Sequence, residues 1–300
     1  MYRIITLEEG MNKLEEGIGK ARMILDGYPT NALFNAEDYN NCVYYMCVQH
    51  PPHDYSLQLY ERFKRALEES ISLKHSSLLV IAPKLQAYQF EALTKVLPSL
   101  MDKNGAPLLT ELLHMWAKYK VMVKCLGGFF LYLDRHFADG KSAAPLRDVS
   151  VVCFHDLVFV KFYDKCRDCA IDLISEDRAE KTIDRGLLKN ISSFFMEIGG
   201  QGNTSYYESF EKAIIADVSI YYSSLASEWL FRYSCTDYIW KAEWCLNQVN
   251  ARASQFLYQT SVEKLLQVLS SSLVLYHCLP EGLIALQLCS VDNQYVELLK

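Results

Sequence analysis

The sequence predicts an all-α protein built from many helices in series. Apolar residues recur at steps of three and four in segment after segment, which is the spacing of one face of a helix. No run of alternating polar and apolar residues predicts a strand. The glycine signatures GxGxxG, GxxxxGK[ST] and GxSxG, which mark nucleotide-binding and hydrolase folds, are absent from the sequence. Long amphipathic helices in series favour a bundle array or an α-solenoid.

The first expected helix covers residues 7–25. One apolar stripe runs along it, formed by Leu7, Met11, Leu14, Ile18, Ala21 and Leu25. Thr6 and Glu9 have the spacing of a capping box, in which each side chain satisfies a free backbone amide. Gly27 can adopt the left-handed conformation that commonly ends a helix.

A corner separates the second expected helix, residues 36–49, from the third. The run His50-Pro51-Pro52-His53 contains two prolines without a backbone donor, so the second helix must end there. Asp54 follows in the N-cap position of the next helix. Tyr60, Phe63 and Leu67 then continue at helical spacing.

A long helical tract is expected over residues 107–137. Gly127 and Gly128 weaken it, because a glycine in a helix interior costs about 1 kcal/mol relative to alanine. Further helices are expected at 147–175, 184–198, 205–230 and 236–258. Two segments resist a helical interpretation, namely 75–95, with a central proline, and 259–300, which Pro280 and Gly282 interrupt.

Composition narrows the class of protein further. The chain is 51% hydrophobic, which excludes wholesale disorder, and its net charge of −6 argues against a binder of nucleic acid. The polar N-terminus is no signal peptide, and no run of about 18 apolar residues predicts a membrane span. The ten cysteines lie in hydrophobic segments without a disulfide-scaffold spacing. We therefore expect a reduced protein of the cytoplasm and nucleus.

Three groups of residues could carry chemistry, and each has a simpler structural interpretation. His50, His53 and Asp54 could bind a metal, but no second ligand cluster is within reach in the sequence. Cys166 and Cys169 form a CxxC motif without the second pair that zinc needs or the βαβ context of a thioredoxin. A third group, of carboxylates, lies outside the hydrophobic stretches that would raise a pKa for acid catalysis, so we expect solvated helix faces: Glu61, Glu68, Glu69, Asp172, Glu176 and Asp177. Binding is therefore favoured over catalysis, with no metal and no cofactor expected.

Five stretches in this order resemble the N-terminal region of plant cullins of the type that forms SCF ubiquitin ligases. They are PPHDYSLQLYERF, YKVMVKCLGGFFLYLDRHF, TIDRGLLKNISSFFMEIG, YYESFEKAIIADVSIYYSSLASEWL and CTDYIWKAEWCLNQVNARASQFL. The resemblance implies an elongated α-solenoid of tandem five-helix cullin repeats. Residues 1–140 would form the first repeat with an insertion near 75–95, residues 141–258 the second repeat and the start of the third, and residues 259–300 a divergent tail, with the resemblance ending near 262.

The resemblance also implies a function. In this family the tip of the first repeat binds a Skp-type adaptor, which carries an F-box protein, through the second and fifth helices. Here these helices would be residues 36–49 and 118–137. The implied contacts are Tyr39, Val43, Tyr44, Met122, Leu126, Phe130 and Leu133, some of which must belong to the repeat core. The HPPHDY corner would join the second and third helices, with no need of a metal.

Several departures from the family pattern bear on adaptor binding. The second helix is about three residues short, which removes a row of contacts and rotates the rest by about 60°. Asn40 and Asn41 stand where apolar contacts are expected. The sequence also lacks the C-terminal cullin-homology domain, which holds the RING-box protein and carries the lysine modified by the ubiquitin-like protein Nedd, so no RING-box partner is expected.

The sequence leaves three hypotheses open. The first is a truncated scaffold that binds the adaptor and competes with complete cullins. The second is a degenerate cullin-like helical module without adaptor binding. The third is an enzyme that uses Cys166 and Cys169 or the histidines His50 and His53.

Overall fold

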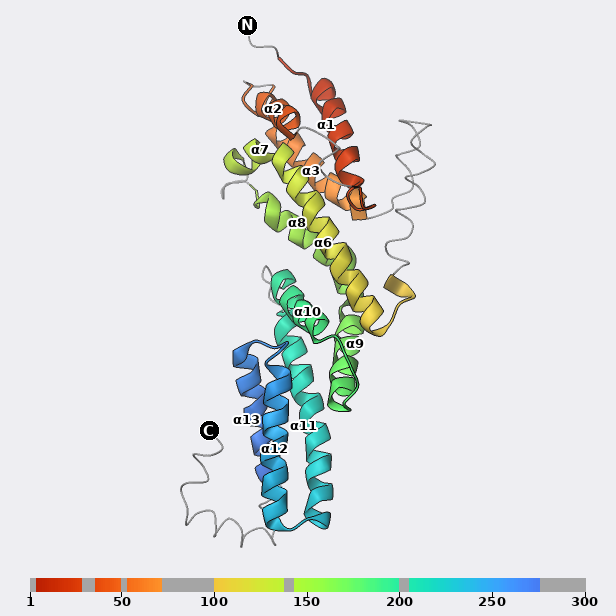
Figure 1. The fold of residues 1–300 in the computed structure, drawn as a ribbon. Coiled ribbons are helices and arrows are strands. Elements are labelled where there is room, and N and C mark those ends of the chain that lie inside the picture. Colours follow the sequence, from red (N-terminus) through yellow and green to blue (C-terminus); the bar gives the residue numbers. More distant parts are fainter. Residues whose placement is uncertain are drawn as a thin grey trace. The chain divides into compact units, whose positions relative to one another are not determined.

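The protein was analysed as a computed structural model, which describes residues 4–28, 36–49, 53–71, 100–137, 143–199 and 205–275 (Figure 1). Throughout these ranges the regular elements are helices, and none of the described residues forms a strand. The all-α prediction is therefore confirmed. The expected insertion near 75–95 lies outside the described residues. The chain forms two compact units, Met1–Cys166 and Arg167–Lys300. The expected repeat boundaries at 140 and 258 stay predictions.

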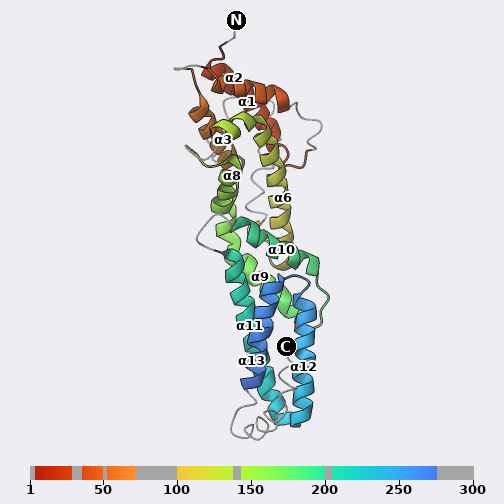
Figure 2. The ribbon, with the colours of Figure 1, turned by 90° about the vertical axis from the view of Figure 1, so that its left-hand side faces the viewer.

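The described residues of the first unit form six α-helices and part of a seventh. They are α1 (Leu7–Arg22), α2 (Ala36–Cys47), α3 (Ser56–Ile71), α6 (Gly105–Phe129), α7 (Leu131–His136), α8 (Leu146–Phe154) and the start of α9 (Val160–Arg178). A π-helical turn, His155–Phe159, joins α8 to α9. Helix α2 packs against α1, α3, α6 and α7 (Figure 2). This places α2 at the centre of the contacts that build the unit's amino-terminal half.

Helix α1 begins where the sequence predicts. The Thr6 hydroxyl accepts a hydrogen bond from the Glu9 amide at 3.2 Å, the first half of the expected capping box. The α-helix ends at Arg22, three residues earlier than expected, and a tighter turn leads to Gly27. Gly27 has a φ of +92°, the left-handed conformation predicted for it.

The corner before α3 has the expected role of a helix start. One Asp54 carboxylate oxygen accepts from the Ser56 amide at 3.0 Å and from the Ser56 hydroxyl at 2.7 Å. Helix α3 begins at Ser56, so Tyr55 occupies the N-cap position that we predicted for Asp54; Asp54, one residue earlier, still satisfies the free Ser56 amide. His50, Pro51 and Pro52 lie outside the described residues.

The tract predicted as one helix over 107–137 is divided in two. Helix α6 continues through Gly127 and Gly128 without a break and ends at Phe129. Phe130 leaves the helical conformation, with φ −96° and ψ 17°, and α7 starts directly after it. The break falls two residues after Gly128, close to the position where the glycine pair lowers helix propensity. Phe130 itself is fully buried.

Two glycines of α1 allow α2 to approach closely. A Cβ atom built on Gly10 would lie 2.2 Å from the sulfur of Met46. A Cβ atom on Gly17 would lie 2.9 Å from Cε1 of Tyr39 and 3.1 Å from Cε2 of Phe129, a residue of α6. Gly17 therefore stands where α1, α2 and α6 come together. Any side chain there would push against two aromatic rings.

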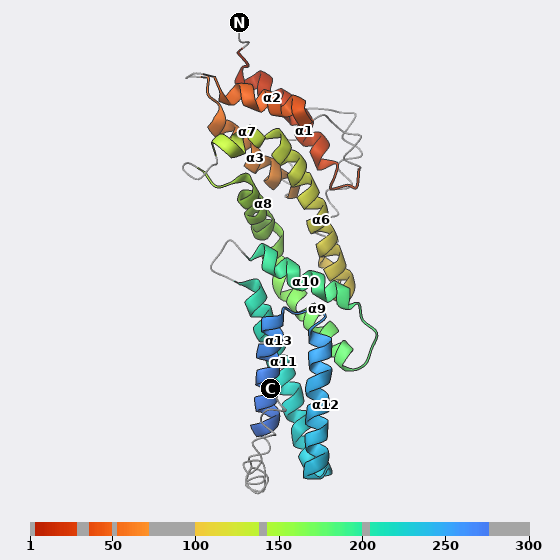
Figure 3. The same ribbon diagram turned by 60° about the vertical axis from the view of Figure 1, so that its left-hand side comes forward.

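The second unit consists of the end of α9, α10 (Arg185–Ile198), α11 (Tyr206–Arg232), α12 (Cys235–Ala253) and α13 (Gln259–Leu275). Helices α11, α12 and α13 pack against one another (Figure 3). Asp184, Ser205 and Ser234 cap α10, α11 and α12, each accepting from an amide three residues later. Side-chain capping of this kind fixes the start of each helix.

Helix α13 falls in the segment that we expected to resist helix formation. Its buried stripe, Val262, Leu265, Leu269 and Leu273, faces α11 and α12. The Tyr238 hydroxyl of α12 donates to the Leu273 carbonyl at 2.7 Å. Residues 259–275 therefore belong to the core of the second unit, and burial of this stripe outweighs the serine-rich composition. Residues 276–300 lie outside the described part.

The contact at Gly17 generates a testable prediction. Gly17→Ala should lower the free energy of unfolding by about 1–3 kcal/mol, because the methyl group overpacks the rings of Tyr39 and Phe129. Gly19→Ala is the matched control, since a Cβ there meets no atom within 4 Å. It should raise stability by up to about 1 kcal/mol through helix propensity. Urea unfolding followed by circular dichroism measures both; equal effects would contradict the proposed contact.

Candidate interaction surface

The structure buries most of the side chains that the sequence assigned to an adaptor contact. Six of the seven are at most 6% exposed: Tyr39, Val43, Met122, Leu126, Phe130 and Leu133. Only Tyr44, which is 40% exposed, lies at the surface. The six buried residues form the core of the first unit, so a partner docking on the surface would not reach them. The expectation that some of the seven belong to the repeat core holds for these six, and the adaptor contact itself stays a prediction.

The burial has a simple physical cause. The Tyr39 ring packs against Phe129 with centroids 4.7 Å apart, and Phe130 packs edge-on against Phe63 of α3 at 5.3 Å. The apolar stripe that periodicity detects on α2 and α6 is thus the stripe that joins the helices to each other. The residues available to a partner therefore lie beside that stripe, not on it.

An exposed aromatic patch does exist on α2 and α7. We define the α2–α7 patch as the exposed residues Tyr44, Tyr45 and Val48 together with the half-buried Tyr132. Tyr44 contacts Tyr132 edge-on at 4.9 Å and Tyr45 at 5.3 Å. Tyr45 is 43% exposed and Val48 is 41% exposed. Tyrosine pairs of this kind offer a large apolar area with a polar end, which is typical of protein interfaces.

Gln49 holds the end of α2 beneath this patch. Its side-chain oxygen accepts from the Ile5 amide at 2.8 Å, and its nitrogen donates to the Ile5 carbonyl at 3.1 Å. The same nitrogen donates to the His53 carbonyl at 3.2 Å. One amide side chain thus fixes the segment before α1, the end of α2 and the corner before α3. No sequence motif predicted that Gln49 would link these three segments.

The two asparagines of α2 lie in different environments. Asn41 is exposed. The side-chain oxygen of Asn40 is buried and has no hydrogen-bond partner among the described residues. An unsatisfied buried acceptor costs free energy. Asn40 therefore lowers the stability of α2, the helix that carries most of the patch.

Of the alternative sites proposed from the sequence, the structure describes His53, Asp54, Cys166 and Cys169, whereas His50 lies outside the described residues. His53 contacts the Tyr55 hydroxyl through Nδ1 at 3.2 Å. Within the part of the chain that the structure describes, no three potential metal ligands gather at one point. Cys166 and Cys169 are both buried. Burial also raises the pKa of the thiols of Cys47, Cys153 and Cys245 to about 11.

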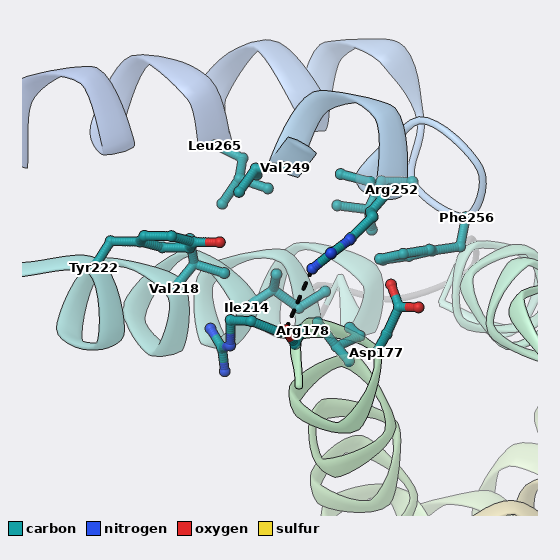
Figure 4. A pocket seen from close by; sticks show the side chains of 12 residues that line it. Asp177, Arg178, Ile214, Val218, Tyr222, Val249, Arg252, Phe256 and Leu265 are labelled. Carbon is teal, nitrogen blue, oxygen red and sulfur yellow. Dashed lines mark hydrogen bonds between the residues drawn. The ribbon is translucent and has the colours of Figure 1, made fainter. Parts of the chain in front are cut away.

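A small cavity lies in the second unit, between α9, α11, α12 and α13 (Figure 4). Its volume of about 40 Å³ has room for a few water molecules, not for a metabolite. Arg252 reaches across it and donates to the Arg178 carbonyl at 3.4 Å. Arg178 itself is paired with Asp217 at 2.7 Å. The cavity is a packing defect between helices rather than a substrate site.

None of the described helices combines the length and the apolar character needed to cross a lipid bilayer.

Comparison with known proteins points to one family. The model of the cullin α-solenoid domain matches residues 14–290, past residue 262 where we expected the resemblance to end. Rice (Oryza sativa subsp. japonica) Cullin-1 is 38% identical over 91% of this chain, and Arabidopsis thaliana putative cullin-like protein 2 is 34% identical over 91%. The aligned regions cover 34% and 68% of those two proteins. A. thaliana cullin-like protein 3 is 29% identical over 88% of this chain and 94% of its own length.

The raised thiol pKa values predict slow alkylation. At pH 8 the Cys153 and Cys245 thiols should react with iodoacetamide about 100-fold more slowly than a free thiol, because a pKa near 11 leaves little thiolate. Exposed Cys235 is the internal control and should be labelled first. Mass spectrometry of the labelled peptides measures the order in which the cysteines are alkylated. A buried thiol that reacts faster than Cys235 would support the enzyme hypothesis.

Proposed function

Because the chain belongs to the cullin family, we propose that it is a non-catalytic scaffold related to cullin-RING ubiquitin ligases. In this proposal its first unit binds a Skp-type adaptor that carries an F-box protein. The observation that carries the proposal is the α2–α7 patch. It lies on the second helix of the first unit and on α7, within the segment 118–137 that the cullin resemblance assigns to adaptor contact.

The patch has the properties of a binding surface of moderate size. Tyr44 lies between Tyr45 and Tyr132, so a partner that covers it would bury three rings together. Truncating a central aromatic residue of an interface typically costs more than about 2 kcal/mol. The buried neighbours Tyr39 and Val43 hold α2 in place without touching the partner. Tyr44 is therefore the residue whose removal should matter most.

The first test is calorimetry with a purified plant Skp-type adaptor. We expect the intact chain to bind with a micromolar or tighter Kd, and Tyr44→Ala to weaken binding by about 30-fold or more. Tyr233→Ala is the matched control, since Tyr233 is 41% exposed and belongs to the second unit. A loss of binding in the control as large as that in Tyr44→Ala would contradict the assignment of the patch.

A second candidate function is a helical interaction module that has lost adaptor binding. Two observations favour it: α2 has only 12 residues, and the Asn40 side-chain oxygen is buried without a described partner. A helix shortened by three residues loses most of one turn of contacts. The partner would then be a protein other than the adaptor.

Lengthening α2 tests the second candidate directly. Three residues inserted before Ala36 should restore adaptor binding if the intact chain shows no heat at high micromolar concentration. The added turn should leave the helical circular dichroism of the first unit intact, which is the control for misfolding. If neither the intact nor the lengthened chain shows heat of adaptor binding, and both are folded, the shortened helix does not explain the loss of binding.

A further inference from the structure

Helix α12 has a second face that the fold does not use. Its buried stripe, which includes Tyr238, Cys245 and Val249, packs toward α11 and α13. Trp240 and Trp244 lie on the opposite side of the helix and are 68% and 56% exposed. Two tryptophans at the surface of one helix, one turn apart, form an apolar area that the described helices of the second unit leave open.

The residues of this face follow a regular spacing. We define the outer face of α12 as Asp237, Trp240, Trp244, Asn247 and Ala251, all of which are exposed. They are separated by steps of three, four, three and four, the spacing of a seam between two packed helices. The two large residues lie in the amino-terminal half of the face, and the smaller Asn247 and Ala251 lie in the carboxyl-terminal half.

This distribution fits the same face of a second molecule placed antiparallel. In a two-fold arrangement Trp240 of each copy would lie opposite Ala251 of the other, and Trp244 would lie opposite Asn247. Each of the layers that these four residues form then pairs one large side chain with one smaller one, which lets the helices interdigitate, while Asp237 lies beyond these layers. A parallel arrangement would instead place tryptophan against tryptophan. We propose that the outer face of α12 is the contact surface of an antiparallel homodimer.

The charges beside the face agree with this arrangement. Lys241 and Glu243 flank it on its two sides, and in the antiparallel register they meet Gln248 and Asn250 of the second copy. No like charges oppose each other, so nothing along the seam repels. Lys241 is also held in place, with its amine 4.3 Å from the centre of the Tyr233 ring and 5.4 Å from that of Trp229.

The available area indicates a weak dimer rather than an obligate one. A buried aromatic side chain removes about 150–250 Å² from water, so four partly exposed tryptophans contribute roughly 500 Å². With the surfaces that they cover, the interface reaches the low end of the range for specific complexes, about 1,200 Å². Asn247 adds a polar group at a seam position, which favours one register at a cost in affinity. A micromolar dissociation constant is therefore expected.

The test is a swap across the proposed seam, measured by sedimentation equilibrium of the full chain between about 1 and 200 µM. Trp240→Ala should weaken the dimer by about 30-fold or more. Ala251→Trp alone should also weaken it, because tryptophan then faces tryptophan in both outer layers. The double variant Trp240→Ala/Ala251→Trp should restore the dimer, since each outer layer regains one large and one small residue.

Ile220→Ala is the control for unspecific adhesion, since Ile220 of α11 is 73% exposed and lies outside the outer face. It should leave the dissociation constant unchanged. All substituted positions are exposed, so circular dichroism should show unchanged folding of each variant. The proposal is overturned if the chain stays monomeric at 200 µM. It is also overturned if the double variant dimerises no more tightly than the single variants, or if Ile220→Ala weakens the dimer as much as Trp240→Ala does. These outcomes are independent of adaptor binding, which the Tyr44 experiment measures in the first unit.

Discussion

The close approach of α1 and α2 is the constraint on which the first unit depends. Gly10 and Gly17 leave room for Met46 and Tyr39, and Tyr39 in turn packs against Phe129 of α6. Once Tyr39, Val43 and Met46 point inward, the 100° step of a helix places Tyr44, Tyr45 and Val48 toward the outside. The surface that we propose for adaptor binding is thus a geometric consequence of two missing side chains on the neighbouring helix.

Charged groups add a second constraint between α1 and α3. The Arg62 guanidinium is almost fully buried and pairs with Glu15, with Nη2 and Oε2 2.7 Å apart. Arg22 pairs with Glu69, which also lies 3.3 Å from Arg62. Removing Glu15 or Glu69 would leave a buried guanidinium with less compensation, although solvent screens these two half-exposed carboxylates. The network therefore holds α3 in one orientation against α1.

Much of the fold could be predicted from the sequence because its determinants are local. The Thr6 cap, the Asp54 corner and the helices near 184–198 and 205–230 follow from spacing and capping residues alone. Gly127 and Gly128 indicated a weakness close to Phe130, but the sequence pattern did not predict that the helix divides there. Helix α13 was missed because its serines mask a stripe that only α11 and α12 make favourable.

The candidate site was harder to predict than the fold, for a physical reason. Periodicity reports the face of a helix that is apolar, and in a packed unit that face is the core. The prediction therefore selected Val43 and Leu126, which are fully buried, and of the patch it found only Tyr44. The neighbours Tyr45 and Tyr132 matter because of a contact between α2 and α7, and such a contact lies beyond the reach of a single-sequence pattern.

The π-helical turn His155–Phe159 has a consequence for comparing related chains. Phe154 and Phe159 are both buried although they lie five residues apart, a separation that a regular α-helix would place about 140° apart. The wider turn absorbs one extra residue and keeps both rings on the same side. A relative with one residue fewer here would form an ordinary α-helix with its core residues still in phase. Alignments through this region should therefore permit a single-residue gap between residues 154 and 160. A gap elsewhere in α8 or α9 would instead rotate every following side chain out of the core.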